Sequence, residues 1–282
     1  MNAAANTPHP VRIRDATLSG RIRANLSDLV RFRHLVWYMA MSSLAVESRG
    51  TKLGRSWWVL EPLALMGVYT VFIKVILHRG GANFPLAVLA ALLSFEFFAR
   101  SVGRSMSLLK ATQSSMLSVA FPRTVIPLAV TLSESIRLII AVAAYIAIAA
   151  PFGVMPSPVT ALALPFIVVE ILFTLGASYF FAATSVFFRD LSKITDYLFW
   201  LLFHLAPGMY TLAMVPAKYR IIFAFNPFTT FFEGLRAPLL YGLAPGFSSV
   251  QTGIVFLVSV ILCIAGYLYF LRREGSFNKV VV

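Results

Sequence analysis

Long apolar stretches recur along this chain and constrain its fold more than any other feature. A helix rises about 1.5 Å per residue, so about 20 apolar residues cross the ~30 Å hydrocarbon core of a bilayer. Stretches of this length with few charges lie at 57–77, 84–104, 125–150, 159–187, 193–214 and 252–271. Only 12% of the residues are charged, against roughly a quarter in soluble domains, which excludes a water-soluble globule. We predict an all-α integral membrane protein with six transmembrane helices.

Prolines refine this prediction. Pro85 and Pro127 lie near the starts of their stretches, where a missing N–H is harmless. Pro165 and Pro207 fall inside the fourth and fifth stretches, and we expect them to bend those helices.

The distribution of basic residues predicts the orientation. The chain has 24 Lys and Arg residues against 11 Asp and Glu. With the N-terminus inside, eighteen basic residues fall on inner segments, Arg100 and Arg104 among them, and five fall on outer ones: Lys74, Arg79, Lys218, Arg220 and Arg236. Inner loops of membrane proteins carry such an excess, so we expect both termini in the cytoplasm and no nucleic-acid partner.

Residues 1–56 precede the first stretch and are predicted to remain as a cytoplasmic segment. They are not a signal peptide, because the first long apolar run begins only at Trp57. Within them, residues 20–46 form a predicted amphipathic helix at the membrane surface. Its apolar stripe, flanked by arginines, consists of Ile22, Leu26, Leu29, Val30, Trp37, Ala40, Met41 and Leu44. A plain membrane anchor and a gating element both fit this pattern.

Two connecting segments are unusual. Residues 105–123 form the longest inner loop, in which 108–120 can be a short amphipathic helix ended by Phe121-Pro122. This helix could dock a soluble partner or simply connect two spans. On the outer side, 217–242 is apolar but interrupted by Asn226-Pro227, a good helix N-cap followed by a good first helical residue. We predict two re-entrant half-helices there, which would have to line a cavity or be buried in protein.

Ionisable residues inside the predicted spans are costly and are expected to face protein or water. They are Glu61, Glu96, Glu134, Arg137, Glu170 and His204. Helical spacing favours local ion pairs of Glu96 with Arg100 and of Glu134 with Arg137.

Aromatic residues share helix faces with some of these groups. One face carries Trp58, Glu61, Leu65, Tyr69 and Phe72, and another carries Tyr197, Trp200 and His204. Sugars stack on aromatic rings and need polar partners for their hydroxyls, so these faces suit carbohydrate. Ordinary helix packing and interfacial aromatic belts explain the same pattern.

Several kinds of chemistry are absent from the sequence. Residues 50–56 have glycines at the wrong spacing for a phosphate-binding loop and an arginine in place of its lysine. The single cysteine, Cys263, and four scattered histidines offer no metal site. We expect no catalytic residue and no cofactor in this chain.

Short motifs in a fixed order carry a resemblance over about residues 29–277. They are Arg49-Gly50-Thr51-Lys52-Leu53-Gly54-Arg55-Ser56-Trp57, Glu61-Pro62-Leu63, Phe121-Pro122-Arg123, Phe188-Arg189-Asp190, and Asn226-Pro227-Phe228-Thr229 with Arg236. In this order and spacing the chain resembles the permease subunits of ABC-2 type polysaccharide exporters, which move lipid-linked glycans such as O-antigens, capsules, teichoic acids or galactans.

The resemblance implies an ABC-2 transmembrane domain at 57–282, in a homodimer with two copies of a separate ATPase that holds ATP and Mg. It implies a polyprenyl-linked glycan as substrate in the cytoplasmic (inner) membrane. The implied substrate path comprises Trp58, Glu61, Tyr69, Phe72, Tyr197, Trp200, His204, Tyr210, Asn226 and Phe228. The implied ATPase-coupling residues are Leu108, Leu109, Met116, Leu117, Arg123, Arg189 and Asp190. The implied contacts for the lipid phosphate are Arg49, Lys52 and Arg55.

Two other functions stay open. An ABC-2 permease for a drug or a lipid would share the fold. A membrane enzyme acting on lipid-linked sugar would need an acidic and histidine cluster at one membrane face, and only Arg189-Asp190 and Asp196 approach one.

Overall fold

The computed structural model describes residues 18–47, 52–81, 83–113, 121–224, 226–246 and 248–277, and these described residues contain no strand. The α-helices are α1 (Leu18–Arg31), α2 (Arg33–Glu47), α3 (Trp57–Thr70), α4 (Phe84–Gln113), α5 (Val125–Ala149), α6 (Ala163–Phe187), α7 (Leu191–Leu205), α8 (Arg220–Ala224), α9 (Pro227–Arg236) and α10 (Ser249–Glu274). Shorter helical turns are η1 (Gly54–Ser56), η2 (Val71–Ile76), η3 (Ala150–Phe152), η4 (Pro158–Leu162), η5 (Leu212–Met214), η6 (Ala217–Tyr219) and η7 (Ala237–Tyr241). The predicted all-helical class agrees with this structure.

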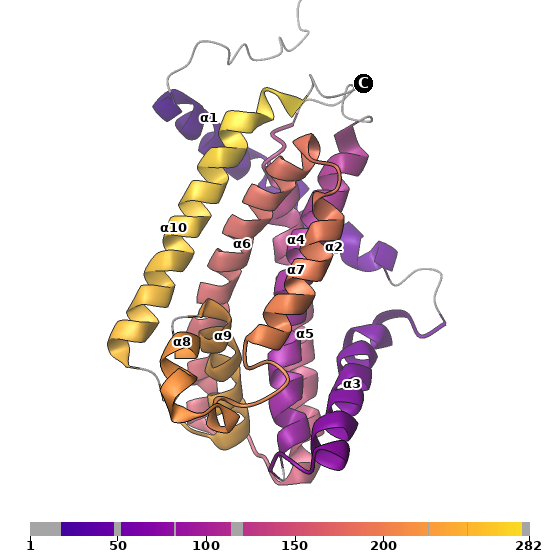
Figure 1. Cartoon of the computed structure of the whole chain (residues 1–282). Coiled ribbons are helices and arrows are strands. Elements are labelled where there is room, and N and C mark those ends of the chain that lie inside the picture. Colours follow the sequence, from indigo (N-terminus) through magenta and orange to yellow (C-terminus); the bar gives the residue numbers. More distant parts are fainter. Residues whose placement is uncertain are drawn as a thin grey trace, which may run out of the picture.

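The long helices form an up-and-down bundle with α4 in the middle (Figure 1). Helix α4 packs against α3, α5, α6, α7 and α9. Of its most apolar stretch 72% is buried, against 11% of the stretch over α3 and η2 at the edge of the bundle. Helix α1 and the end of α10 lie at one end of the bundle, and α8 and α9 lie at the other (Figure 1).

Among the residues that the structure describes, five helical segments are long and apolar enough to cross a membrane. They are Gly54–Ile76, Phe84–Thr112, Val125–Phe152, Pro158–Phe187 and Val250–Glu274, and they correspond to five of the six predicted spans. The chain is therefore a multi-pass membrane protein by length and composition.

The sixth predicted span, 193–214, differs from its expectation. Helix α7 has only 15 residues and ends at Leu205. Pro207 was expected to bend a longer helix, but the helix stops before it, since proline cannot donate the hydrogen bond that continuation requires. Pro165 does not lie mid-helix either, because α6 begins at Ala163 and places this proline in the first turn.

Helix α4 runs beyond its predicted end. It is continuous through Gln113, so a separate short helix beginning at Leu108 is wrong. Consequently Arg104, expected at the end of the second span, lies well inside this helix, as does Arg100. Arg236, counted with the outer basic residues, has a completely buried side chain.

Helices α6 and α10 pack at unusually close range. A Cβ atom on Gly266 would lie 2.1 Å from the carbonyl oxygen of Gly176, and one on Gly176 would lie 2.5 Å from the backbone nitrogen of Cys263. The two helices therefore touch backbone to backbone, as small residues permit in membrane proteins.

Candidate functional site

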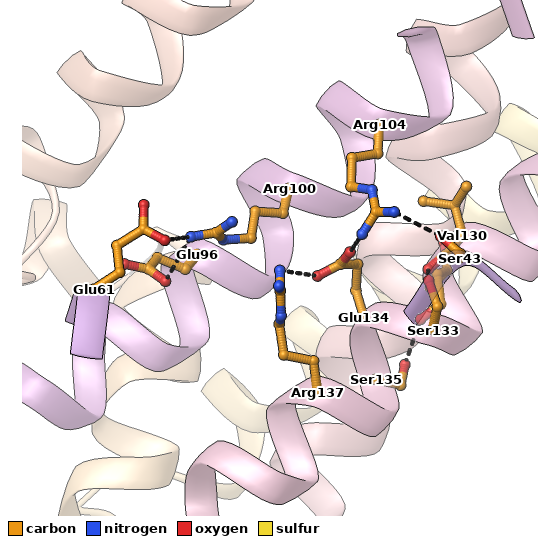
Figure 2. Close-up of polar contacts among 11 residues, drawn as sticks. Ser43, Glu61, Glu96, Arg100, Arg104, Val130, Ser133, Glu134, Ser135 and Arg137 are labelled. Carbon is orange, nitrogen blue, oxygen red and sulfur yellow. Dashed lines mark hydrogen bonds and ion pairs between the residues drawn. The ribbon is translucent and has the colours of Figure 1, made fainter. Parts of the chain in front are cut away.

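A cluster of charged side chains joins α3, α4 and α5 (Figure 2). On one side, the Arg100 guanidinium donates to the carboxylates of Glu61 on α3 and Glu96 on its own helix, the latter at 3.5 Å. The predicted pair of Glu96 and Arg100 is confirmed, whereas the contact of Arg100 with Glu61 was not predicted. Glu61 therefore faces a cation of the same chain.

The other side of the charged cluster is centred on Glu134, whose side chain is fully buried. Its carboxylate accepts hydrogen bonds from Arg104 and, at 3.2 Å, from Arg137, which confirms the predicted pair of Glu134 and Arg137. Arg104 also donates to the Ser43 hydroxyl on α2 at 2.6 Å. A buried ionised carboxylate is costly without such paired cations, so this cluster fixes α2, α4 and α5 relative to one another.

Trp58 closes the charged cluster from α3. Its ring centre lies 5.1 Å from the Arg137 guanidinium carbon, a cation–π arrangement. A cavity of about 20 Å³ lies beside these two residues and is also lined by Glu96 and Arg100, enough space for about one water molecule. Trp58 is 8% exposed in the single chain and contacts protein.

The remaining intramembrane carboxylate, Glu170 on α6, lies apart from this cluster. It is fully buried and accepts a 2.5 Å hydrogen bond from the Ser94 hydroxyl on α4. Sequence analysis gave no partner for it, because the two residues are 76 positions apart.

The two predicted aromatic faces meet at one point. The Tyr69 hydroxyl of α3 and the His204 ring of α7 lie 3.4 Å apart, and the Trp200 ring stacks over His204 with ring centres 4.3 Å apart. Beyond this contact the two faces leave aromatic side chains exposed: Tyr197 at 78%, Trp200 at 62% and Phe72 at 45%. The exposed part of the predicted substrate path therefore lies on α3, η2 and α7.

The predicted break at Asn226-Pro227 is confirmed. The Asn226 side chain accepts a hydrogen bond from the Phe228 backbone N–H at 3.0 Å and caps α9, with Pro227 as its first residue. Helix α9 then enters the bundle, where Phe228 is 5% exposed and packs with the core rings of Phe98 and Phe173. Phe228, predicted to line the path, is thus a core residue of the single chain.

Arg236 joins α9 to the rest of the bundle by hydrogen bonds. Its Nε donates to the carbonyl oxygen of Ala87 on α4 at 2.9 Å, and its Nη2 donates to the carbonyls of Pro207 and Gly208 at 3.0 and 3.2 Å. Its Nη1 donates to Glu233 at 2.5 Å. The carbonyls of Pro207 and Gly208 lie at the break after α7, so Arg236 supplies the hydrogen bonds that the interrupted helix lacks. Tyr210, a predicted path residue, donates to Leu205 O at the same break.

At the other end of the bundle, several predicted coupling residues come together. Leu109 is buried and Leu108 packs beside it in the last turns of α4. From the same turns, the Lys110 ammonium donates to the carbonyl of Arg189 at 3.3 Å, next to Asp190 at the start of α7.

The start of α5 joins the same end. The backbone N–H of Arg123 donates to the Glu274 carboxylate at 2.8 Å. Burial lowers the pKa of the Arg123 guanidinium, and the charge of Glu274 opposes this shift.

Some predicted site residues take no part in these contacts. Arg49, Met116 and Leu117 lie outside the described residues. Lys52 and Arg55 are exposed just before α3.

A groove of about 640 Å³ lies between α2 and the end of α4, lined by Met39, Ser43 and Arg104 among others.

Comparison with known proteins shows which sequences this chain is similar to. Two proteins of Klebsiella pneumoniae, each named O-antigen export system permease protein RfbA, are 25% and 24% identical to the chain over 239 residues, covering 84% of this chain and 91% of each relative. A protein of the same name from Myxococcus xanthus is 26% identical over 254 residues, covering 89% of this chain and 97% of that relative. The family model for ABC-2 type transporters matches residues 34–240. These residues include α2 to α9 and with them the charged cluster, so the chain belongs to the ABC-2 type transporter family.

Proposed function

We propose that this chain is the membrane subunit of an ATP-driven exporter that moves a lipid-linked polysaccharide across the cytoplasmic membrane. The observation that carries this proposal is the similarity, over more than four fifths of the chain, to three proteins named as O-antigen export permeases. Five apolar helices and membership of a transporter family support it. In this proposal two copies of the chain associate with two copies of a separate ATPase, and both termini are cytoplasmic.

Reconstitution tests the proposal directly. The chain is coexpressed with a candidate ABC ATPase subunit, placed in proteoliposomes, and supplied with a polyprenyl-diphosphate-linked glycan. We expect ATP-dependent movement of the glycan to the far leaflet and no movement without the ATPase. Transport of a lipid or drug with no response to glycan would favour the alternative ABC-2 permease. Turnover of lipid-linked sugar by the isolated chain would favour a membrane enzyme.

We propose that the exposed aromatic face of α3 and α7 lines the glycan path between the two copies. Trp200 is the sharpest test because its side chain is 62% exposed and needs no change in the core. Trp200→Ala should reduce export while ATPase association stays intact, since it removes the aromatic surface on which a sugar ring would stack. Phe256→Ala on α10, at the opposite edge of the bundle from α3, is the control, with a 50% exposed ring (Figure 1). An equal loss of export in Trp200→Ala and Phe256→Ala would contradict the proposal that this face lines the glycan path.

The predicted role of Glu61 needs a different test, because this carboxylate pairs with Arg100. If Glu61 contacts sugar, Glu61→Gln should impair export while the melting temperature is unchanged. If its role is to hold α3 in place, the same substitution should lower both export and the melting temperature. Trp58→Ala is expected to reduce export as well, and its contact with Arg137 makes the stability measurement equally necessary.

We further propose that 105–123, together with Arg189 and Asp190, docks with the ATPase. The contact between Lys110 and Arg189 supports a single docking face. Leu108→Asp and Arg189→Glu should weaken copurification of the ATPase, whereas Arg79→Glu at the other end should not. Undiminished copurification of both variants would contradict this assignment.

A further inference from the structure

The N-terminal helix α1 is joined to the bundle by a hydrogen-bonded centre at its residue Asn25. The Oδ1 atom of Asn25 accepts from the Thr124 hydroxyl at 3.0 Å and from the Tyr267 hydroxyl at 2.9 Å. Asn25 is only 8% exposed, although it lies on an otherwise largely exposed helix. One side-chain oxygen therefore connects α1, the start of α5 and the last third of α10.

This centre is built from groups that are themselves held in place. The Tyr179 hydroxyl of α6 donates to the Thr124 carbonyl at 3.1 Å, and the Tyr179 and Tyr267 rings stack edge to face with centres 5.6 Å apart. Because buried hydroxyls and amides are costly without partners, these contacts fix the rotamers on both sides of Asn25. Thr124 and Tyr179 are buried almost completely.

The position of Thr124 connects this hydrogen-bonded centre to the proposed docking segment. Thr124 directly follows Phe121-Pro122-Arg123, the end of the segment proposed to dock with the ATPase. At the same point the Arg123 backbone N–H is bonded to Glu274 of α10. Thr124 thus joins the end of the docking segment to Asn25 by a direct hydrogen bond.

We infer that Asn25 is a positioning residue that couples the surface helix α1 to the ATPase-docking segment, so that α1 moves when nucleotide binding moves that segment. This inference rests on the proposed function, because it assigns a regulatory path to the proposed docking face. Helix α1 carries Arg23, Leu26 and Val30 on its exposed surface, so its movement shifts groups suited to the membrane interface.

Isosteric substitutions isolate the hydrogen bonds. Thr124→Val and Tyr267→Phe each remove one donor without a change of shape, and Asn25→Leu removes the acceptor for both. Tyr269→Phe on the same helix α10 is the matched control, since its hydroxyl contacts Thr184 and not Asn25. In the reconstituted complex we expect ATP hydrolysis to persist in the three variants while glycan moved per ATP falls at least about fivefold, the lower end of usual coupling effects. The control should match the wild type.

Hydrogen exchange measured by mass spectrometry gives a readout that stability alone does not move. In the wild-type complex, a non-hydrolysable ATP analogue should change amide exchange both in 105–113 and in α1. In Asn25→Leu the response of 105–113 should remain and that of α1 should disappear. Thr124→Val added to Asn25→Leu should have no further effect, because the two act through one contact.

The outcomes separate the inference from the function on which it rests. If α1 still responds to nucleotide in Asn25→Leu, the inference is overturned. A wild-type complex that binds nucleotide but moves no glycan would contradict the proposed function, while the exchange response of α1 would still decide the role of Asn25. If Asn25→Leu does not fold, Thr124→Val, which removes the direct hydrogen bond from Thr124 to Asn25, keeps the same two readouts.

Discussion

At the scale of single residues, the bundle is organised by charges that are buried together. Glu134 lies between two arginines, and Arg236 lies among backbone carbonyls at a helix break. In an apolar environment such groups are stable only as complete sets, because removal of one member leaves another uncompensated.

Glu134 gives a prediction at this scale. Glu134→Ala should destabilise the protein by about 3–5 kcal/mol, since Arg104 and Arg137 lose their shared partner. Glu61→Ala, in a half-exposed pair with Arg100, should cost roughly 1 kcal/mol or less. Denaturant unfolding in detergent micelles compares the two. Similar costs would mean that burial does not distinguish these ion pairs.

Arg236 gives a second prediction at the scale of single residues. Arg236→Lys keeps the charge but loses the planar fork that reaches several carbonyls at once, so we expect a loss of about 2 kcal/mol or more. Arg220→Lys is the control, because Arg220 is exposed and its Nε bonds the Val215 carbonyl. Thermal unfolding monitored by tryptophan fluorescence measures both, and an unchanged melting temperature for Arg236→Lys would contradict the anchoring role.

At the scale of helices, close packing of α6 with α10 is the most sensitive contact. Gly266→Ala would place a Cβ atom against the Gly176 backbone, which cannot give way as a flexible side chain can. We expect a cost of about 1–3 kcal/mol. Gly253→Ala on the same helix meets nothing within 4 Å and should be neutral or stabilising. Unfolding of the two variants in the same detergent decides the matter, and equal stability would exclude this close approach.

At the scale of the whole molecule, the two ends of the bundle differ in charge. Among the described residues, the end that holds α1 and the α6–α7 turn exposes Arg23, Arg31, Arg33, Arg189, Lys193, Arg272 and Arg273, whereas the other end exposes Lys74, Arg79, Lys218 and Arg220. This arrangement predicts the orientation relative to the membrane.

Cysteine labelling tests that orientation in a Cys263→Ser background. An impermeant thiol reagent added to intact cells should label Arg79→Cys. It should label Lys193→Cys only after the membrane is permeabilised. The reverse pattern would invert the topology and with it the placement of the docking face.

The sequence by itself determined the elements whose cause is local. Apolar length gave five of the spans, the Asn226-Pro227 pair gave the start of α9, and spacing of three or four residues gave the ion pairs of Glu96 and Glu134. Order and spacing of short motifs indicated the family that the comparisons then supported. Each of these rests on residues close together in the chain.

Only the tertiary structure decided which distant groups meet. The contacts of Glu61 with Arg100, Glu170 with Ser94 and Asn25 with Tyr267 join residues 39, 76 and 242 positions apart. No periodicity encodes such pairs, because an apolar face specifies that a helix packs but not against which partner. For the same reason, the sequence predicted the pair of Arg100 with Glu96 on its own helix, but not the contact of Arg100 with Glu61 or of Arg104 with Glu134 on neighbouring helices.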